Sequence, residues 1–382
     1  MVLPATQGLY IGLMSGTSLD GVDAVLADFD AAAAPDTPPQ PGRVLGHVSQ
    51  PFEPALRQAL LALNASGPDE LHRAALAGNA LARAYAQAVQ ALLAQCNVSA
   101  TAVRAIGAHG QTVRHQPQVV DGTGYTLQLN QPALLAELTG IEVVADFRSR
   151  DIAAGGQGAP LAPFFHRAWF GRPGESLGVL NIGGIANLTV LADDGATTGW
   201  DCGPGNVLMD GWIGQHLGQA YDDRGAWAAS GRVLPGLLEQ LRREPYFERL
   251  PPKSTGRDLF HLPWLEAQLA SFQPASPADV QATLCEFTAR ACADDLLRHA
   301  PFLRRLVVCG GGALNDHLMG RLAACLPGVL VQSTVAAGLP PLQVEAAAFA
   351  WLARQTVRRE PLPLTSTTGA RGARVLGCIY PA

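Results

Sequence analysis

The sequence predicts an α/β protein of two domains, each built on a β-sheet flanked by helices. Three observations lead to this prediction. The chain has 382 residues, which is longer than a domain with a single hydrophobic core usually is. Segments with strand character alternate with segments of helical period along its length. A Gly-rich strand–turn–strand pattern occurs near residue 16 and again near residue 184, so the second half repeats the first. We therefore expect two related domains whose hairpin turns face a shared cleft.

Composition narrows the class of protein. Hydrophobic residues make up 48% and charged residues 15%, which is typical of a globular chain with a large core. The formal net charge is -5 and the 27 Lys and Arg are scattered, so we expect no nucleic-acid partner. The seven cysteines form no CxxC pair, the N-terminus has no basic leader, and no apolar stretch approaches a membrane span. These features favour a cytoplasmic protein that does not bind membranes.

The expected elements follow in order through the first half. Residues 8–29 predict a hairpin with a polar tip, and residues 44–50 a third strand. Apolar residues at helical spacing predict one or two helices between 54 and 96. Strands are expected at 104–108 and 125–129, each ending at a polar cluster.

The second half begins near Asp146, where a run of Gly and Ala is poor in both helix and strand formers. We expect the first domain to comprise residues 1–145 and about 355–382, and the second domain residues 146–354. A second hairpin is expected at 177–192 and a strand at 305–309. Helices are expected in three further segments, 277–299, 313–326 and 344–357.

The first hairpin tip, residues 12–23, combines three glycines with hydroxyls and the carboxylates of Asp20 and Asp23. Open backbone N–H groups could bind phosphate oxygens while a carboxylate positions Mg²⁺. An ordinary tight hairpin capped by Asp and Ser explains the composition equally well. The tip is not a P-loop, because GxxxxGK[ST] is absent.

Four further segments have residue types suited to chemistry. The turn 181–187 repeats the donor-rich pattern, although a structural turn explains it as well. Asp201 follows a strand and precedes a helix, where either a general base or a helix cap would lie. The triple glycine at 310–312 would let a nucleotide approach the backbone closely. Glu345 begins an apolar helix, where capping competes with catalysis.

These segments, in this order, resemble the anhydro-N-acetylmuramic acid kinases of the sugar kinase, Hsp70 and actin superfamily. The most specific strings are GLMSGTSLDGVD at 12–23 and ADFRSRDIAAGGQGAPL at 145–161. Further matching strings are AHGQTVRHQP at 108–117, LQLNQP at 127–132, LNIGGIANLTVL at 180–191, DCGPGNVLMD at 201–210, PPKSTGRDLF at 251–260, VCGGGALNDHLM at 308–319 and VEAAAFAWLA at 344–353.

The resemblance implies the actin-like ATPase fold, with a mixed sheet flanked by helices in each domain and the active site in the interdomain cleft. It implies that ATP, 1,6-anhydro-N-acetylmuramic acid and water give ADP and N-acetylmuramic acid 6-phosphate, a step in peptidoglycan recycling and amino sugar catabolism. Asp201 corresponds to the general base and Glu345 to a glutamate at the cleft. At residue 202 the family more often has Thr than Cys. A homodimer is also implied.

The resemblance assigns the remaining site residues by class. Those expected to bind ATP are Gly16, Thr17, Ser18, Leu19, Asp20, Gly21, Val22, Asp23, Gly183, Gly184, Asn187, Gly203, Gly205, Asn206, Gly310, Gly311, Gly312 and Asn315. Asp20 is the candidate partner of Mg²⁺, through water. Those expected on the sugar side are His109, Gln111, Arg148 and Arg150. A guanidinium fork suits either the lactyl carboxylate or the transferred phosphoryl group.

Two other functions remain open from the sequence. A catalytically silent ATP-binding module of the actin or Hsp70 type would need no base at Asp201 and no DFRSRD segment. A kinase of ordinary hexoses would share the ATP site but would not need to activate water.

Overall fold

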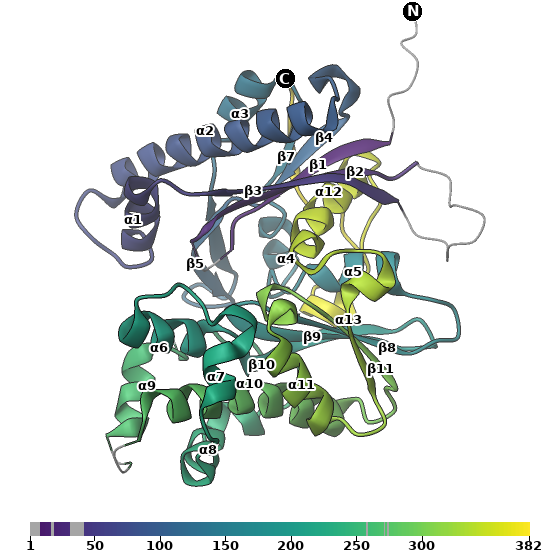
Figure 1. Ribbon diagram of the computed structural model, residues 1–382. Coiled ribbons are helices and arrows are strands. Elements are labelled where there is room, and N and C mark those ends of the chain that lie inside the picture. Colours follow the sequence, from purple (N-terminus) through teal and green to yellow (C-terminus); the bar gives the residue numbers. More distant parts are fainter. Residues whose placement is uncertain (1–7, 17–18, 31–41, 257–258, 271, 273–274) are drawn as a thin grey trace, which may run out of the picture. The chain divides into compact units, whose positions relative to one another are not determined.

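The computed structural model describes residues 8–16, 19–30, 42–256, 259–270, 272 and 275–382. The chain forms two compact units (Figure 1): Met1–Trp169 with Gln343–Ala382 is unit 1, and Phe170–Leu342 is unit 2. The sequence placed these boundaries near 145 and 355 instead. Residues 146–169 and the helix that begins at 344 therefore pack with the first unit, for a reason given below.

Unit 1 is built on a six-stranded sheet in the order β13-β7-β4-β1-β2-β3. Its strands are β1 (Leu9–Met14), β2 (Gly21–Asp28), β3 (Arg43–Pro51), β4 (Ala105–Ala108), β7 (Val143–Ala145) and β13 (Cys378–Tyr380). Its helices are α1 (Pro54–Ala62), α2 (Glu70–Cys96), α3 (Pro132–Thr139), α4 (Ser149–Ala153), α5 (Ala162–Phe170), α12 (Val344–Val357) and α13 (Thr365–Thr368), with a short 3₁₀ turn η1 (Ala100–Ala102).

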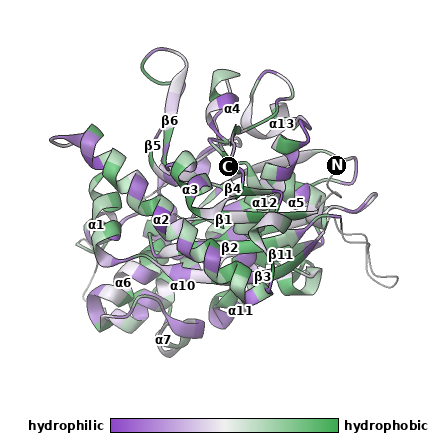
Figure 2. Cartoon of the chain, turned by 90° about the horizontal axis from the view of Figure 1, so that it is seen from above, coloured by the Kyte–Doolittle hydropathy of each residue, from purple (hydrophilic) through white to green (hydrophobic). Residues whose placement is uncertain are grey.

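Successive side chains of β1 point to opposite faces of the sheet, and their sizes decide which helix covers each face. Ile11 and Leu13 are fully buried in a core that they share with Leu81, Tyr85 and other residues of α2. The long helix α2 covers this face because its apolar residues recur every three or four positions, and Figure 2 shows hydrophilic and hydrophobic residues alternating along it.

The opposite face of the sheet is covered by helix α12, which lies against bare backbone. A Cβ on Gly12 would overlap the carbonyl oxygen of Ala346, and one on Gly107 would overlap that of Phe349. Because neither strand residue has a side chain, the helix backbone rests directly on β1 and β4. This close packing explains why α12 belongs to unit 1 and not to the second domain.

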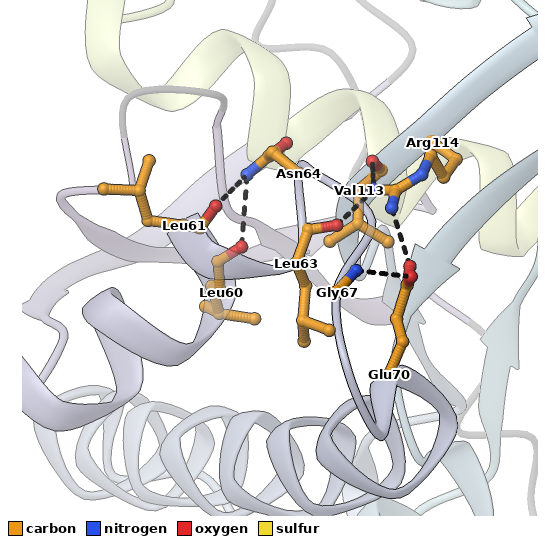
Figure 3. A network of polar contacts seen from close by, with 8 residues as sticks. All are labelled: Leu60, Leu61, Leu63, Asn64, Gly67, Glu70, Val113 and Arg114. Carbon is orange, nitrogen blue, oxygen red and sulfur yellow. Dashed lines mark hydrogen bonds and ion pairs between the residues drawn. The ribbon is translucent and has the colours of Figure 1, made fainter.

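A two-stranded hairpin, β5 (Gln111–Pro117) and β6 (Gly124–Leu129), also belongs to unit 1. Figure 3 shows how Arg114 attaches it to the α1–α2 turn. The Arg114 guanidinium contacts Glu70 at 2.6 Å and also donates to the carbonyl oxygens of Val113, at 2.9 Å, and Leu63. Strand β5, which begins at Gln111 within the polar cluster 109–111, is thereby anchored through Arg114.

Unit 2 is built on a five-stranded sheet in the order β10-β9-β8-β11-β12. Its strands are β8 (Leu177–Ile182), β9 (Ile185–Leu191), β10 (Thr197–Pro204), β11 (Arg305–Cys309) and β12 (Leu330–Ser333). Its helices are α6 (Val207–Leu217), α7 (Ala226–Ser230), α8 (Pro235–Arg242), α9 (Leu262–Leu269), α10 (Pro277–His299) and α11 (Asp316–Cys325). Short 3₁₀ turns are η2 (Asp223–Gly225), η3 (Pro245–Glu248), η4 (Gly311–Leu314), η5 (Thr334–Ala337) and η6 (Pro341–Gln343).

Both sheets have the same strand order and directions. In each, the first three strands form an antiparallel meander, and the fourth and fifth run parallel to the first on its other side. Unit 1 adds β13 at its edge. The repeat seen in the sequence is therefore a repeat of topology, and the predicted actin-like fold, with a helix-flanked mixed sheet in each half, is confirmed.

No helix in the described ranges is long and apolar enough to cross a membrane.

Candidate active site

Asp201 lies near the end of β10, the edge strand of the unit 2 sheet, and is held by the segment 246–255. Its backbone N–H donates to the carbonyl oxygen of Lys253 at 3.1 Å, and its own carbonyl oxygen accepts the Tyr246 hydroxyl at 2.7 Å. Its carboxylate oxygen Oδ2 accepts the backbone N–H of Thr255 at 3.0 Å. Three contacts from one segment therefore fix both the main chain and the carboxylate of Asp201.

The environment of Asp201 suits a general base. Burial raises the pKa of its carboxyl to about 6, while the Thr255 N–H and the positive charge of Lys253 oppose this shift. A base is most effective when its pKa lies close to the working pH. Asp201 is thus mostly ionised at neutral pH and still a much better proton acceptor than an exposed aspartate.

Asp201 is the last of three polar residues aligned across the sheet. Asn181 of β8 pairs with Asn187 of β9, and Asn187 pairs with Asp201 of β10. Residues directly opposite in neighbouring strands point to the same face, which here is the face away from the core residues Leu188 and Trp200. The Asn181 side chain is buried, and its Oδ1 has no hydrogen-bond partner.

Two glycine turns of unit 2 pack against each other beside this row. The backbone N–H of Gly205 donates to Gly184 O at 2.9 Å, and that of Asn206 donates to Gly183 O at 2.8 Å. A β-bulge in β10 at Gly203, whose φ is +145°, turns the chain into this contact, and a Cβ there would lie 2.7 Å from the Phe247 ring. The predicted turns at 183–187 and 203–206 are therefore neighbours in space.

The triple glycine adjoins the same turns. Gly310 has φ +77°, and a Cβ on it would overlap Asn181 Oδ1. A Cβ on Gly311 would lie 3.4 Å from Asn206 Nδ2, and one on Gly312 would overlap Ile182. The sequence predicted that these glycines leave backbone exposed to a nucleotide. In the structure, Gly310 and Gly312 also have no room for a side chain, because Asn181 and Ile182 lie against them.

Two residues near these turns have structural partners. The Asn315 side chain accepts the Leu318 N–H at 2.9 Å, so its oxygen caps helix α11. The thiol of Cys202 is fully buried and interacts with that of Cys292 on α10, which together with burial raises its pKa. Cys202 therefore faces the core of unit 2, and Asp201 keeps its three contacts beside it.

In unit 1 the first hairpin tip is held by polar contacts from neighbouring elements. The Ser15 hydroxyl contacts the Tyr85 hydroxyl at 2.7 Å, and Gln111 Nε2 donates to Gly16 O at 3.1 Å. Gln111 Oε1 is buried and has no partner. Thr17 and Ser18 lie outside the described residues. These contacts fix the start of the predicted phosphate segment.

The rest of the tip divides into core and surface positions. Leu19 and Val22 are buried in the core of unit 1, so only their backbone could meet a nucleotide. Gly21 lies against the backbone of Gln50. Asp23 pairs with His47 at 3.0 Å, whereas Asp20 is exposed and carries no ion pair within the described chain. Of the two carboxylates, Asp20 is therefore the better placed to meet a metal ion.

Metal binding by protein side chains alone has no support in the described residues, which contain no group of three His, Cys, Asp or Glu that could hold an ion. A single carboxylate such as Asp20 fits the way Mg²⁺ binds with nucleotides, through water and substrate phosphates.

Arg148, His109 and Glu345 form a second polar cluster in unit 1. Arg148 donates to His109 Nε2 from Nη2 at 3.0 Å and from Nε at 3.3 Å, and to Gly158 O at 2.8 Å. Burial lowers the pKa of Arg148 to about 10, and the negative charge of Glu345 opposes this shift. Burial and Arg148 lower the pKa of His109 to about 3, so the imidazole is a neutral acceptor. The His109 ring also packs on Phe349 of α12, at 4.7 Å between centroids.

Arg150 does not join this cluster. It is exposed and lines a surface hollow of about 380 Å³ with Thr356, Arg359 and the backbone near Gly377. The turn of helix α4 between Arg148 and Arg150 directs the two side chains to different surroundings, which two-residue spacing on a helix produces. The structure thus unites His109 and Arg148 and separates Arg150 from them.

Lys253 and Asp295 are functional candidates that the sequence did not identify. Lys253 lies in the PPKSTGRD string, but nothing in that string indicates a partner on α10. Asp295 is one of several polar residues in a long helix, and only the fold shows that it is buried and paired.

Comparison with known proteins places the chain in a family. The sequence profile described as "Anhydro-N-acetylmuramic acid kinase" matches residues 8–382. A protein of that name from Variovorax paradoxus is 63% identical over 98% of this chain and 99% of its own. Proteins of the same name from Albidiferax ferrireducens and Cupriavidus metallidurans are 58% and 57% identical, over 98% and 99% of this chain and 99% of each relative. The chain therefore belongs to the anhydro-N-acetylmuramic acid kinase family.

Proposed function

We propose that this protein uses ATP to phosphorylate 1,6-anhydro-N-acetylmuramic acid and opens its anhydro bridge with water, giving N-acetylmuramic acid 6-phosphate and ADP. The observation that carries the proposal is the family match over residues 8–382 together with 63% identity to a relative of that name. The reaction would serve peptidoglycan recycling and amino sugar catabolism.

In this proposal Asp201 is the general base. Its carboxylate takes a proton from water, and the water oxygen bonds to the anomeric carbon as the bond from that carbon to oxygen 6 breaks. Oxygen 6 forms a bond to the γ-phosphorus, and the bond from phosphorus to the β,γ-bridging oxygen breaks, releasing ADP. The phosphoryl group accepts the leaving oxygen, so the site needs no strong acid. A raised pKa and a fixed carboxylate both support this role.

We assign the ATP side to the glycine turns at 16–23, 183–187, 203–206 and 310–312. Mg²⁺ would neutralise charge on the phosphates, and Asp20 would hold it through water. Asp20→Asn should therefore raise the Mg²⁺ concentration required for half-maximal activity. Asp30→Asn is the control, because Asp30 lies outside the glycine turns and its exposed side chain pairs with Arg358. An unchanged Mg²⁺ requirement in Asp20→Asn would remove this assignment.

We assign the sugar side to His109, Gln111, Arg148 and Glu345. Arg148 is half-buried and stays charged at neutral pH, which suits a carboxylate or phosphoryl ligand. The unpartnered Gln111 Oε1 offers an acceptor for a sugar hydroxyl or amide. Glu345 supports the charge of Arg148. Arg150 remains a sequence prediction, without a contact that joins it to these residues.

The test is product analysis after incubation with ATP, Mg²⁺ and the anhydrosugar in oxygen-18 water. A 6-phosphate with the label on its anomeric hydroxyl is expected. A phosphorylated sugar that is still bicyclic and unlabelled would instead indicate another sugar kinase. Equal use of N-acetylmuramic acid or glucosamine derivatives would favour a kinase of ordinary hexoses, and slow ATP loss without a sugar product would favour a silent ATP-binding module.

We also propose that the protein is a cytoplasmic homodimer, as the family resemblance implies. Sedimentation equilibrium at micromolar concentration measures the state directly, and a monomer mass would refute the dimer. Fractionation of cells tests the compartment.

A further inference from the structure

Lys253 and Asp295 form an ion pair that lies deep in unit 2 behind Asp201. The ammonium of Lys253 is 2.9 Å from each carboxylate oxygen of Asp295, and the two side chains are 2% and 4% exposed. Trp200, the neighbour of Asp201 in β10, donates its indole N–H to Asp295 at 3.1 Å. The pair therefore links helix α10 to strand β10, which carries Asp201, and to the segment 246–255, which contacts it.

The same lysine belongs to the segment that holds Asp201. Its carbonyl oxygen accepts the Asp201 N–H, and the Thr255 N–H two residues later binds the carboxylate. The Lys253 ammonium also lies 5.0 Å from the centre of the Tyr246 ring, whose hydroxyl binds the Asp201 carbonyl. The Lys253–Asp295 pair therefore anchors the segment from which the three contacts to Asp201 come.

Stability alone is a poor explanation for this arrangement. Removing two charges from water costs several kcal/mol per ion, and buried pairs are often replaced by apolar residues at no loss of stability. An apolar pair in place of Lys253 and Asp295 would not provide a positive charge near Asp201. Lys253 opposes the rise that burial causes in the pKa of Asp201. The Asp295 carboxylate, 2.9 Å from the Lys253 ammonium, offsets part of that positive charge.

Three other titratable groups near Asp201 have pKa values shifted in favour of their neutral forms. Burial raises the pKa of Tyr246, and burial with mutual contact raises that of Cys202 beside Cys292. Burial lowers the pKa of His299, whose Nε2 is 3.9 Å from Asp295. The charged and titratable groups that surround Asp201 and its neighbours are Tyr246, Arg249 and Lys253 of segment 246–255, Cys202 of β10, and Cys292, Asp295, Arg298 and His299 of α10.

We propose that the Lys253–Asp295 pair is a positioning unit for Asp201, which fixes the segment that holds its carboxylate and sets the charge that the carboxylate experiences. The proposal rests on the proposed role of Asp201 as the base. Lys253 and Asp295 act through Asp201 and touch no reacting atom.

The pH profile of kcat/KM separates this role from a merely structural one, because the two single substitutions have opposite expected effects. Lys253→Met leaves the negative Asp295 near Asp201, disfavours the charged base, and moves the acid limb to higher pH. Asp295→Asn leaves Lys253 unopposed and moves the limb to lower pH. Each shift should be about half a pH unit or more, the scale of a partly screened buried charge. Arg305→Met removes an exposed ion pair with Glu175 in the same unit and should leave the acid limb of kcat/KM at the wild-type pH.

Two outcomes contradict the proposal. One is an unmoved acid limb in folded single variants. If either single variant fails to fold, the variant Lys253→Met/Asp295→Leu, which buries no charge, provides the second test. It should fold, bind ATP normally, and lose roughly tenfold or more in kcat because the carboxylate is less well held. An unchanged kcat in this variant would also reject the proposal.

Amide hydrogen exchange distinguishes failure of this inference from failure of the proposed function. If the wild-type protein forms no labelled sugar phosphate, the proposed function fails whatever the variants do. The Thr255 amide should still exchange faster in Lys253→Met/Asp295→Leu than in wild type if the pair anchors the segment, and equal exchange would reject that anchoring.

Discussion

Arg148 and His109 are joined by two hydrogen bonds to a single ring nitrogen, His109 Nε2, at 3.0 and 3.3 Å. Since a nitrogen that accepts hydrogen bonds is unprotonated, His109 orients Arg148 and does not serve as an acid through Nε2. The low pKa of about 3 agrees with this arrangement.

His109→Leu removes the acceptor and should raise the KM for the sugar roughly tenfold, the effect of losing one charge-assisted hydrogen bond. His109→Gln restores an acceptor and should recover most of the loss. Because His109 stays neutral above about pH 4, neither variant should shift the acid limb of kcat/KM. Steady-state kinetics from pH 5 to 8 decide the point, and a shifted limb would show that His109 itself titrates in the reaction.

Asp201→Asn should lower kcat by about 10²- to 10⁴-fold, the usual contribution of a general base, while ATP binding measured by calorimetry is retained. Full activity in this variant would refute the mechanism. In the wild-type enzyme, kcat/KM should fall with decreasing pH below about 6, where the Asp201 carboxylate becomes protonated.

The same substitution should stabilise the protein at neutral pH. The folded-state pKa of Asp201 is raised above its unfolded value, so its contribution to stability is present at low pH and is lost as pH rises through about 6. Asn removes the buried charge and keeps an oxygen for the Thr255 N–H. The melting temperature of Asp201→Asn should therefore exceed that of wild type at pH 7.5, with the difference shrinking toward pH 5. A lower melting temperature at pH 7.5 would contradict the assigned cause of the shift.

Gly12→Ala should destabilise unit 1 by about 1–3 kcal/mol or more, because the added methyl group meets the backbone of helix α12, which cannot move aside without leaving the sheet. Gly320→Ala, at an exposed position of helix α11, is the control, since no atom lies within 4 Å of the added Cβ. It should be neutral or slightly stabilising. Urea unfolding of both variants gives the comparison, and equal effects would show that α12 is less tightly packed than described.

Arg114→Met should loosen the β5–β6 hairpin while leaving the sheets intact. The substitution removes the ion pair with Glu70 and the bonds to the carbonyl oxygens of Leu63 and Val113. Faster amide exchange confined to residues 111–129 is the expected result. Arg104→Met, which removes a more exposed pair with Glu142, serves as the control and should leave exchange in the hairpin unchanged.

The sequence was most accurate for elements whose own residues show a clear periodicity or composition. The helices at 277–299 and 344–357 and the strand at 305–309 begin and end where periodicity and composition place them. The two compact units differ from the predicted domains because the position of α12 depends on Gly12 and Gly107, which lie far away in the chain and matter only through their small size. Strand β13, three residues long, carries too little pattern to be recognised.

The candidate site shows the same division. The family motifs singled out Asp201 and the glycine turns, whose residue types alone fit ordinary turns and a helix cap as well. The roles of Lys253, Tyr246 and Asp295 could not be identified, because a buried ion pair and a tyrosine hydrogen bond arise only when the segment 246–255, strand β10 and helix α10 come together. Arg150 was assigned to the sugar side together with Arg148 by the family resemblance, and helix α4 directs the two side chains to different surroundings.

The place of α12 in the chain has a consequence for how the protein is made. The helix that covers one face of the unit 1 sheet is synthesised after all of unit 2, so Gly12 and Gly107 lie on an uncovered surface until residue 357 has left the ribosome. Unit 2, whose strands are contiguous in sequence, can complete its sheet earlier. Unit 2 is therefore expected to fold first. Until α12 is synthesised, the N-terminal strands depend on chaperones, or on rapid completion of the chain, for protection from aggregation.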